Sequence, residues 1–437
     1  MGERLNGSRH VFFVAYGGGH VTMVVPVMRE LQQRGVRCTL LALTTGHAKA
    51  IEMGVQPKGY RDFRHLVPDL DEVLSWGEQL AAENSHPAVD PMETQLYLGV
   101  NYAEWVHQHG PAEAVRMYRE SGRLGFVPRT FMKRVLQEVM PDAVVTTNTP
   151  RTEQAAIEAA VALGIPSLAM IDLFALPYDT FLRRPVHADR IAVISKAAKL
   201  NVIAAGIPAE RIVVTGNPAF DSLAAPGMLR LADEFKARMG WVGRKVVLLA
   251  GQLELLPGTP EHFRGPGLVI EVEKRLRAWV AAGDDRALIV RYHPNEFQSF
   301  PDLGPQPRVH QSHPVREDLH PVLLAADLVV VQTSTVGLEA VISGRKLLSL
   351  AFLPAVTPER WDYGALGLAV SVPAVEDLTR LLEDSLLKPA APLGDFQVGA
   401  AARNVADEVL RLVDERSGSL EGGCRIMDEV DKTQSST

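Results

Sequence analysis

The chain has 437 residues, too many for one ordinary hydrophobic core and enough for two domains. Hydrophobic residues make up 46% of it and charged residues 22%, a balance that excludes a disordered protein. Its formal net charge of −7 lacks the positive excess by which proteins attract nucleic acid, so we expect no nucleic-acid partner.

Cysteine usage and the first residues predict a cytoplasmic protein. Cys38 and Cys424 are too few for a disulfide framework or a cysteine-built zinc site. The opening run MGERLNGSRH is polar and leads into an expected strand, which predicts no signal peptide. No apolar run approaches the roughly 18 residues of a membrane span, and contact with a membrane surface through a loop stays open.

Short apolar runs alternate with helical patterns through most of the chain, and these runs predict strands. They are Val11–Ala15, Arg37–Leu43, Ala143–Thr147, Ser167–Ile171, Ile191–Ser195, Ile212–Thr215, Lys245–Ala250, Ala287–Tyr292, Leu328–Gln332 and Lys346–Leu350. Strands separated by helices favour a parallel sheet with helices on both faces. Two such series predict two Rossmann-like, doubly wound α/β domains, over residues 1–185 and 186–390.

Three segments stand outside this alternation. Residues 60–140 are polar, helical in pattern and rich in aromatic residues, and we interpret them as a helical insert in the first domain. Such an insert commonly shapes the pocket for a variable substrate, and plain packing is the equal alternative. Tyr97, Tyr102 and Trp105 fit either role. Residues 391–416 predict a helix, and 417–437 a loose tail.

The first predicted strand ends in three glycines and a histidine, within VFFVAYGGGHVTMVVPVMRELQQRG (residues 11–35). Ligands of open α/β sheets bind beyond the carboxyl ends of the strands. Gly18 and Gly19 would let the backbone approach such a ligand, and the following helix offers free N–H groups. His20 would then point into a cleft between the domains. In the alternative, the glycines form a tight turn and the histidine merely caps or packs.

Polar turns follow four predicted strands of the second domain. VTGNPAFDSL brings Asn217, LLAGQLE brings Gln252, VRYHPNE brings His293, and VVVQTSTVGLEAVISG brings Ser334, Thr335 and Glu339. Hydroxyl and N–H groups at a helix start suit phosphate oxygens, and a glutamate one turn further on suits ribose hydroxyls. Each residue also has an ordinary alternative as a cap, a turn residue or a solvated side chain. Because all four turns follow strands of one predicted domain, we interpret that domain as binding a nucleoside diphosphate.

These motifs resemble the GT-B group of nucleotide-sugar enzymes, in which two Rossmann-like domains face each other across a cleft. The run GGGH is similar to the glycine-rich loop of the peptidoglycan N-acetylglucosaminyl transferase. The run VISKAAKLNVIAAGIPAERIVVTGNPAFDSL resembles a stretch of the UDP-N-acetylglucosamine 2-epimerases. The HP pair and the later Ser-Thr pair resemble motifs of bacterial sialyltransferases. The resemblance covers roughly residues 10–50 and 140–415.

The resemblance implies roles for the turns of the second domain. Ser334, Thr335 and Gly337 would hold the donor phosphates and Glu339 the ribose, while Gln252 and His293 would line the phosphate side of the cleft. The donor would be a UDP-sugar, with a CMP-sugar as the alternative, and the helix near 398–415 would return to the first domain. We expect no cofactor and no metal, because the one DLDE run (Asp69–Glu72) reads as a solvated turn in the insert.

Two reactions fit this resemblance, and they require different carboxylates. The hydrolysing 2-epimerases carry an aspartate where this chain has Asn148, and an amide cannot act as a general base. Asp172 is the nearest carboxylate to their next acidic position. An inverting transferase needs one base, for which His20 is the candidate, with Asp172 as its orienting partner or as the base itself. We therefore expect a glycosyltransferase with an unidentified acceptor; an epimerase-like enzyme is the alternative, and a non-catalytic nucleotide-sugar-binding protein a third.

Overall fold

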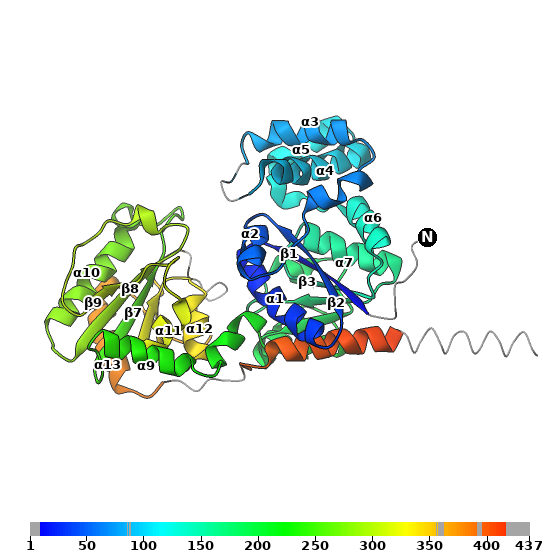
Figure 1. Ribbon diagram of the computed structural model, residues 1–437. Coiled ribbons are helices and arrows are strands. Elements are labelled where there is room, and N and C mark those ends of the chain that lie inside the picture. The colour runs from blue at the N-terminus through cyan, green and yellow to red at the C-terminus, as the bar shows by residue number, and fades with distance from the viewer. Residues whose placement is uncertain are drawn as a thin grey trace, which may run out of the picture. The chain divides into compact units, whose positions relative to one another are not determined.

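A computed structural model describes residues 9–84, 86, 89–354, 356, 362–390 and 396–416. The chain forms two compact units, each built around a parallel sheet (Figure 1). The first unit extends to Ala219 and is rejoined by the chain at Ala400, and the second is Phe220–Gly399.

The first unit contains a six-stranded sheet with the strand order β2-β1-β3-β4-β5-β6. Every neighbouring pair in it is parallel. The strands are β1 His10–Tyr16, β2 Arg37–Leu43, β3 Ala143–Thr147, β4 Ser167–Met170, β5 Arg190–Val193 and β6 Ile212–Val214. Helices α1 Gly18–Gln33, α2 Thr45–Glu52, α7 Thr152–Leu163 and α8 Lys196–Ala204 lie between strands in the chain.

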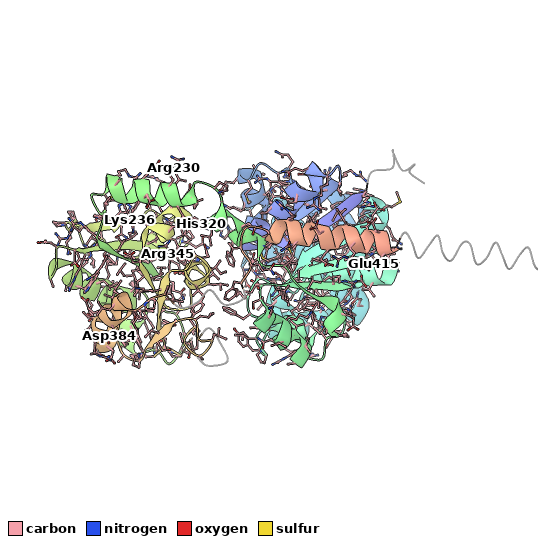
Figure 2. All side chains as sticks on the ribbon, turned by 90° about the horizontal axis from the view of Figure 1, so that it is seen from below. Arg230, Lys236, His320, Arg345, Asp384 and Glu415 are labelled. Carbon is pink, nitrogen blue, oxygen red and sulfur yellow. The ribbon has the colours of Figure 1, made fainter. Side chains whose placement is uncertain are left out.

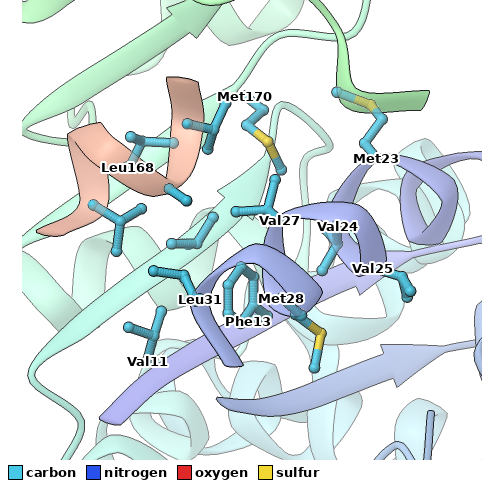
Figure 3. Packing of buried hydrophobic residues seen from close by; sticks show 14 of the residues in the cluster. Val11, Phe13, Met23, Val24, Val25, Val27, Met28, Leu31, Leu168 and Met170 are labelled. Atoms are coloured by element: carbon cyan, nitrogen blue, oxygen red, sulfur yellow. The ribbon is translucent and has the colours of Figure 1, made fainter. Parts of the chain in front are cut away.

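Both faces of this sheet are buried, because successive side chains of a strand point to opposite sides. Val11 and Phe13 of β1 pack with α1 and with a helix over residues 401–416. Figure 3 shows part of this cluster. Phe12 and Val14 pack on the other face with α7 and the helical insert. The helix over 401–416 is therefore part of the core of the first unit.

The predicted helical insert is confirmed. It comprises the 3-10 helix η1 Tyr60–Leu66 and the α-helices α3 Leu70–Ala81, α4 Pro91–His109, α5 Pro111–Ser121 and α6 Arg129–Val139. Two glycines let α3 and α4 pack closely: a Cβ on Gly77 would lie 2.1 Å from the Gln95 carbonyl oxygen, and one on Gly99 would lie 1.9 Å from that of Val73. No helix among the described residues is long and apolar enough to cross a membrane.

The second unit contains another six-stranded parallel sheet, with the order β12-β11-β10-β7-β8-β9. Its strands are β7 Lys245–Gly251, β8 Arg286–Tyr292, β9 Val309–Gln311, β10 Leu328–Val331, β11 Lys346–Leu350 and β12 Val370–Val372. Its helices are α9 Met228–Arg238, α10 Gly267–Ala281, α11 Leu319–Ala325, α12 Val336–Ile342 and α13 Leu378–Leu387. Apolar side chains of α10 and α13 cover one face of this sheet.

The structure corrects the predicted organisation in two places. The expected domain boundary at residue 185 would divide the first sheet, because β5 pairs with β4 and β6 pairs with β5. The units separate only after Ala219. The strands β9 and β12 were not predicted, since each has only three residues and lies at an end of the sheet. The predicted strands are all present, and their observed ends differ from the predicted ends by at most two residues.

Candidate functional site

In each sheet the strand order reverses beside the first strand of the unit. In the first sheet, β1 lies between β2 and β3, so the chain continues to one side of β1 and later returns on the other. In the second sheet, β7 lies between β8 and β10 in the same way. Open α/β sheets bind ligands beyond the carboxyl ends of the strands at such a reversal. The turns after β1 and β3, and those after β7 and β10, are therefore candidate sites.

The turn after β1 combines one strained glycine with two unconstrained ones. Gly17 has φ 95° and ψ 162°, a conformation that favours glycine strongly. At Gly18, an added Cβ would make only ordinary contacts with Lys49, and at Gly19 it would meet nothing within 4 Å. Neither residue has a positive φ. Nothing in the described chain therefore requires glycine at 18 and 19, and their bare backbone leaves room for a ligand.

His20 lies in the first turn of α1, and its ring is held at one nitrogen. Nδ1 lies 2.9 Å from the Tyr16 carbonyl oxygen and 2.8 Å from the Thr149 hydroxyl. Because a carbonyl oxygen can only accept, Nδ1 carries a hydrogen. In the neutral ring Nε2 is then the nitrogen that accepts a proton, and the side chain is 22% exposed. His20 therefore has the tautomer that a general base needs.

Beside Nδ1 lies Glu153, a fully buried carboxylate in the first turn of α7. Its oxygens accept hydrogen bonds from the Tyr16 N–H at 2.7 Å, the Thr147 hydroxyl at 2.7 Å and the Thr149 N–H at 2.9 Å. One oxygen lies 3.8 Å from His20 Nδ1. Burial raises the pKa of Glu153, and His20 and these donors oppose that shift. Glu153 thus joins the turn after β1 to the turn after β3.

The other ring nitrogen of His20 faces Asp172, which follows β4. Nε2 lies 3.7 Å from Oδ2 of Asp172, whose side chain is 32% exposed. Burial by itself would lower the pKa of His20, but Asp172, Glu153 and the Tyr16 carbonyl outweigh it and raise the pKa to about 8. The structure therefore brings the two predicted catalytic residues together, and His20 is mostly protonated at pH 7.

Three further polar residues lie at the same edge of the sheet. The Asn148 side chain donates to Asp179 at 3.4 Å, and its backbone carbonyl accepts from Arg184 at 2.7 Å. Burial raises the pKa of Asp179 and lowers that of Arg184 to about 10. Asn148 Oδ1 and Arg184 Nη1 are buried without a hydrogen-bond partner among the described residues. Buried unpaired groups cost free energy, and a site that binds a polar substrate accounts for them.

Backbone strain is concentrated in the same turns. Thr44 after β2, Arg151 after β3 and Ala175 after β4 have φ of 52°, 80° and 51°. Each such conformation costs a residue with a side chain about 1 kcal/mol or more. The Arg151 guanidinium lies over the ring of Tyr16, 3.7 Å from its centroid. Strain of this kind clusters at functional sites, which favours the carboxyl edge of the first sheet as one.

Asn217, predicted as a nucleotide contact of the second domain, lies in the first unit. Its side-chain N–H donates to the Asp172 carbonyl oxygen at 3.0 Å, and its Oδ1 accepts from the Ala219 N–H at 2.9 Å. The side chain is buried. The amide N–H therefore ties the turn that carries Asp172 to the turn after β6, and the amide oxygen fixes the latter turn. The correction has the same cause as the boundary, namely the pairing of β6 with β5.

In the second unit, the turns after β7 and β10 are joined by hydrogen bonds. Gln252 Nε2 donates to the Thr333 hydroxyl at 2.7 Å, and the Gln252 N–H donates to Gln332 Oε1 at 3.4 Å. Gln332 is buried. These bonds fix the backbone where the strand order reverses, so Gln252 lies where the sequence predicts a ligand site. Thr333 was not predicted.

The turn from Ser334 to Gly337 has a structural role as well as the predicted one. The Ser334 carbonyl accepts from the Gly337 N–H at 3.0 Å and from the Tyr363 hydroxyl at 2.8 Å. A Cβ on Gly337 would lie 2.9 Å from the Tyr363 ring, so packing alone accounts for this glycine. Thr335 is exposed, and its side chain does not cap α12. The phosphate contacts of these residues stay a prediction, for which Thr335 is the best placed.

His293 is exposed and forms part of its own turn. Its N–H donates to the Gly251 carbonyl at 2.8 Å, which joins the ends of β8 and β7. Its ring Nδ1 accepts from the Asn295 N–H at 3.3 Å. The ring therefore stabilises the turn, and its predicted place beside a phosphate is not tested by these contacts.

Glu339 belongs to a short chain of polar contacts. Its Oε2 lies 3.1 Å from Nε2 of His320, and Nδ1 of His320 lies 3.0 Å from the Ser222 hydroxyl. Figure 2 labels His320, which lies in α11. Glu339 is 8% exposed, so it is not a solvated helix residue. The contact with His320 holds the Glu339 carboxylate in one orientation. A residue that accepts hydrogen bonds from a ribose needs such a fixed orientation.

Glu153, Asp179 and Arg184 were not predicted from the sequence. Glu153 had a readable signal, since it is a carboxylate in the first turn of an alanine-rich helix directly after a predicted strand. Asp179 and Arg184 flank a 3-10 helix, Thr180–Arg183, in a stretch without periodicity. No pattern in the sequence distinguishes them from surface residues.

No protein-family model and no curated protein sequence matches this chain. Several solved structures resemble it. The UDP-GlcNAc 2-epimerase of Neisseria meningitidis, bound to UDP-GlcNAc, is 16% identical with a TM-score of 0.58, over 92% of this chain and 100% of that one. The UDP-GlcNAc 2-epimerase of Methanocaldococcus jannaschii, in complex with UDP-GlcNAc and UDP, is 15% identical with a TM-score of 0.53, over 92% and 99%. MurG of Acinetobacter baumannii is 15% identical with a TM-score of 0.51, also over 92% and 99%.

These similarities show the fold. The chain has two Rossmann-like α/β units with a helical insert in the first, and this arrangement is the GT-B fold that the sequence resemblance implies.

Proposed function

We propose that this protein is a glycosyltransferase that moves a sugar from a UDP-linked donor to a hydroxyl-bearing acceptor. The observation that carries the proposal is the setting of His20. Its Nδ1 hydrogen is held by the Tyr16 carbonyl, and its Nε2 faces Asp172. An acceptor hydroxyl must lose a proton as it attacks the anomeric carbon, and a partly exposed histidine with this tautomer can accept that proton.

The proposed step balances as follows. The acceptor oxygen bonds to the anomeric carbon, the bond from that carbon to the diphosphate oxygen breaks, and the acceptor proton passes to His20 Nε2. Asp172 and Glu153 stabilise the imidazolium that forms. Because the pKa of His20 is about 8, the neutral form that can act as a base grows as the pH rises through 8. The proton then leaves to solvent.

We assign the donor nucleotide to the second unit. Thr335, with Ser334 and Gln252, would bind diphosphate oxygens, and His293 would lie on the same side. Glu339, oriented by His320, would accept hydrogen bonds from the ribose. The solved neighbours that contain UDP-GlcNAc or UDP support a uridine donor. No metal is needed in this scheme, since the hydroxyls and the protein N–H groups serve the departing diphosphate.

A 2-epimerase-like reaction is the second candidate, and a second carboxylate favours it. Asp179 lies close enough to Asp172 for the two charges to interact, and burial holds the pKa of Asp179 above its usual range. Two acids in different environments can divide the roles of general acid and general base. Two of the three solved structures described above are 2-epimerases.

Two measurements on the purified protein test the proposal. Calorimetric titration with UDP, CDP, CMP and GDP identifies the nucleotide, and we expect UDP to bind most tightly. Incubation with UDP-GlcNAc and no acceptor then separates the reactions. An intact donor supports the transferase, whereas release of UDP with a 2-epimerised sugar establishes the second candidate. Failure of all four nucleotides to bind would overturn both.

His20→Gln tests the base directly once turnover is measured. It should lower kcat by at least about a hundredfold, since general base catalysis contributes that much, while the donor affinity stays within about threefold. His65→Gln is the matched control, because His65 is an exposed histidine of the insert that pairs with Glu138. An equal loss of kcat and donor affinity in His20→Gln would make His20 a binding residue.

A further inference from the structure

The chain passes between the two units twice, at Ala219–Phe220 and at Gly399–Ala400. The first passage lies within the 3-10 helix η5 Pro218–Ala224. Within the second unit the two passages are joined, because the Gly399 N–H donates to Asp221 Oδ1 at 2.8 Å. The helix η5 is therefore the segment at which the second unit holds both of its connections to the rest of the chain.

A chain of hydrogen bonds runs from η5 to Glu339. The Ser222 hydroxyl lies 3.0 Å from Nδ1 of His320, and Nε2 of His320 lies 3.1 Å from Oε2 of Glu339. Because a carboxylate oxygen can only accept, Nε2 carries a hydrogen and donates it. In the neutral ring Nδ1 is then an acceptor, so the Ser222 hydroxyl donates to it. One imidazole ring thus joins the connecting segment to the carboxylate that we assign to the ribose.

A second cation near Glu339 has its hydrogen bonds elsewhere. Burial lowers the pKa of Arg291, and the charges of nearby carboxylates, Glu339 among them, oppose that shift. The Arg291 guanidinium donates to the Ser312 hydroxyl at 2.7 Å and to two backbone carbonyls of the loop before α11 at 3.1 Å and 2.9 Å. These bonds fix the loop. The side chain that orients Glu339 by a direct hydrogen bond is His320.

We propose that His320 is a positioning residue that couples nucleotide binding at Glu339 to the ordering of η5. The inference rests on the proposed function, which assigns the ribose to Glu339, and it holds for the transferase and for the epimerase-like enzyme alike. A ribose hydroxyl binds most tightly to a carboxylate that is already oriented. His320 orients that carboxylate best when Ser222 holds the other side of its ring.

The coupling acts in both directions. A bound nucleotide favours the oriented carboxylate, and with it the bond between His320 and Ser222. By linkage, that bond must raise the nucleotide affinity by the same factor as the nucleotide favours the bond. Occupation of the ribose site is therefore communicated to the segment at which the chain enters the second unit.

Burial determines which end of the hydrogen-bond chain responds. The Glu339 side chain is 11% exposed and that of His320 is 23% exposed, whereas Ser222 is an exposed residue. A hydrogen bond at the surface competes with water and opens more readily than one that is shielded. Without nucleotide, the bond between Ser222 and His320 is therefore the one that opens, and η5 opens with it.

Amide hydrogen exchange on the full-length protein, with and without saturating UDP, tests the coupling. In the wild-type protein, UDP should slow exchange at least about threefold in peptides that cover residues 219–225. Ser222→Ala removes one exposed hydroxyl, so the protein should still fold. It should abolish this slowing and weaken UDP binding about threefold in calorimetry, as the loss of one hydrogen bond predicts.

Two matched variants separate the coupling from a general change at η5. Ser222→Thr keeps a hydroxyl at the same position and should restore both the slowing and the wild-type UDP affinity. Ser75→Ala removes an exposed hydroxyl from α3 of the insert and should change neither quantity.

A third variant interrupts the chain at its centre. His320→Phe keeps a ring in place but removes both hydrogen bonds. It should abolish the slowing, and it should weaken UDP binding more than Ser222→Ala does, because Glu339 then loses the donor that orients it. The melting temperature of each variant checks that the second unit remains folded.

The outcomes separate this inference from the proposed function. Slower exchange with UDP in the wild-type protein and in Ser222→Thr, together with its loss in Ser222→Ala, supports the coupling. UDP that binds without slowing exchange at 219–225, or that slows it equally in Ser222→Ala, overturns the coupling and leaves the nucleotide site standing. If UDP, CDP, CMP and GDP all fail to bind the wild-type protein, the proposed function is rejected and this inference with it.

Discussion

The ionisation of His20 can be measured without knowing the substrate, and it tests the geometry on which the proposed base depends. Nε2 of His20 lies 3.7 Å from the Asp172 carboxylate. Two unit charges at that distance attract by about 1 kcal/mol in bulk water, and by more next to protein of lower dielectric constant. Since about 1.4 kcal/mol corresponds to one pKa unit, Asp172→Asn should lower the pKa of His20 by about one unit.

The direction follows from which form the carboxylate stabilises. Asp172 favours the imidazolium, so the wild-type His20 should titrate near pH 8, and removal of the charge should move that titration to lower pH. If neutral His20 is the base, kcat/KM should rise with pH along the same curve and the rise should move with it in Asp172→Asn. A rate that instead falls through pH 8 would indicate that His20 acts as an acid.

Ring-labelled histidine and NMR titration from pH 5 to 10 provide the assay. The chain has 13 histidines, so the His20 signal must be assigned from its loss in His20→Gln. Asp179→Asn is the control, because Asp179 makes its hydrogen bonds with Asn148 and Phe181, and its effect on His20 should be the smaller one. A wild-type pKa below 6.5, or no change in Asp172→Asn, would refute the arrangement described here.

Three further predictions concern individual residues. Gly19→Ala should raise the free energy of unfolding by about 0.5 kcal/mol, because a helical glycine is costly and no atom blocks the added methyl group. It should nevertheless lower turnover at least about tenfold if a ligand approaches the backbone at Gly19. The melting temperature measures the first effect, and kcat measures the second. Glu153→Gln should lower the free energy of unfolding, measured in urea, by about 2–4 kcal/mol, because the new amide N–H group would face buried hydrogen-bond donors. Unchanged stability would contradict the hydrogen bonds assigned to Glu153. Glu339→Ala should weaken UDP binding about tenfold in calorimetry with an unchanged circular dichroism spectrum, and an unchanged affinity would remove Glu339 from the ribose site.

The strands could be predicted because a parallel sheet covered on both faces needs nearly continuous apolar runs. The segments around Val11 and Val329 are such runs, and turn residues bound them clearly. Sheet membership could not be predicted in the same way. The run at Ile212 reads as a strand whichever sheet it joins, and only its pairing with β5 places it in the first unit. The displaced boundary and the wrong placement of Asn217 both follow from this one ambiguity.

The candidate site was predicted to the extent that it depends on local chemistry. His20 follows a glycine run and Asp172 follows a predicted strand, and these positions indicate a functional role. In the structure both side chains are partly exposed. Glu153 could not be ranked in the same way, because its importance comes from donors on two separate turns, at Tyr16 and at Thr147 to Thr149. These groups meet only when β1 and β3 pair, over a separation of more than a hundred residues in the chain.

The hydrogen bonds of the acidic residues also bear on the choice between the two reactions. Epimerisation at a sugar carbon removes a proton and later returns one, and it is served best by two groups that can exchange protons with substrate. Asp179 accepts from the Phe181 N–H with one oxygen and from Asn148 with the other, and Glu153 is fully buried. Asp179 is partly exposed, but both of its oxygens already accept hydrogen bonds, whereas Asp172 is partly exposed and faces His20. The pair of His20 and Asp172 is what removal of a single acceptor proton requires, and it supports the proposed transfer even though 2-epimerases are among the structures that the chain resembles.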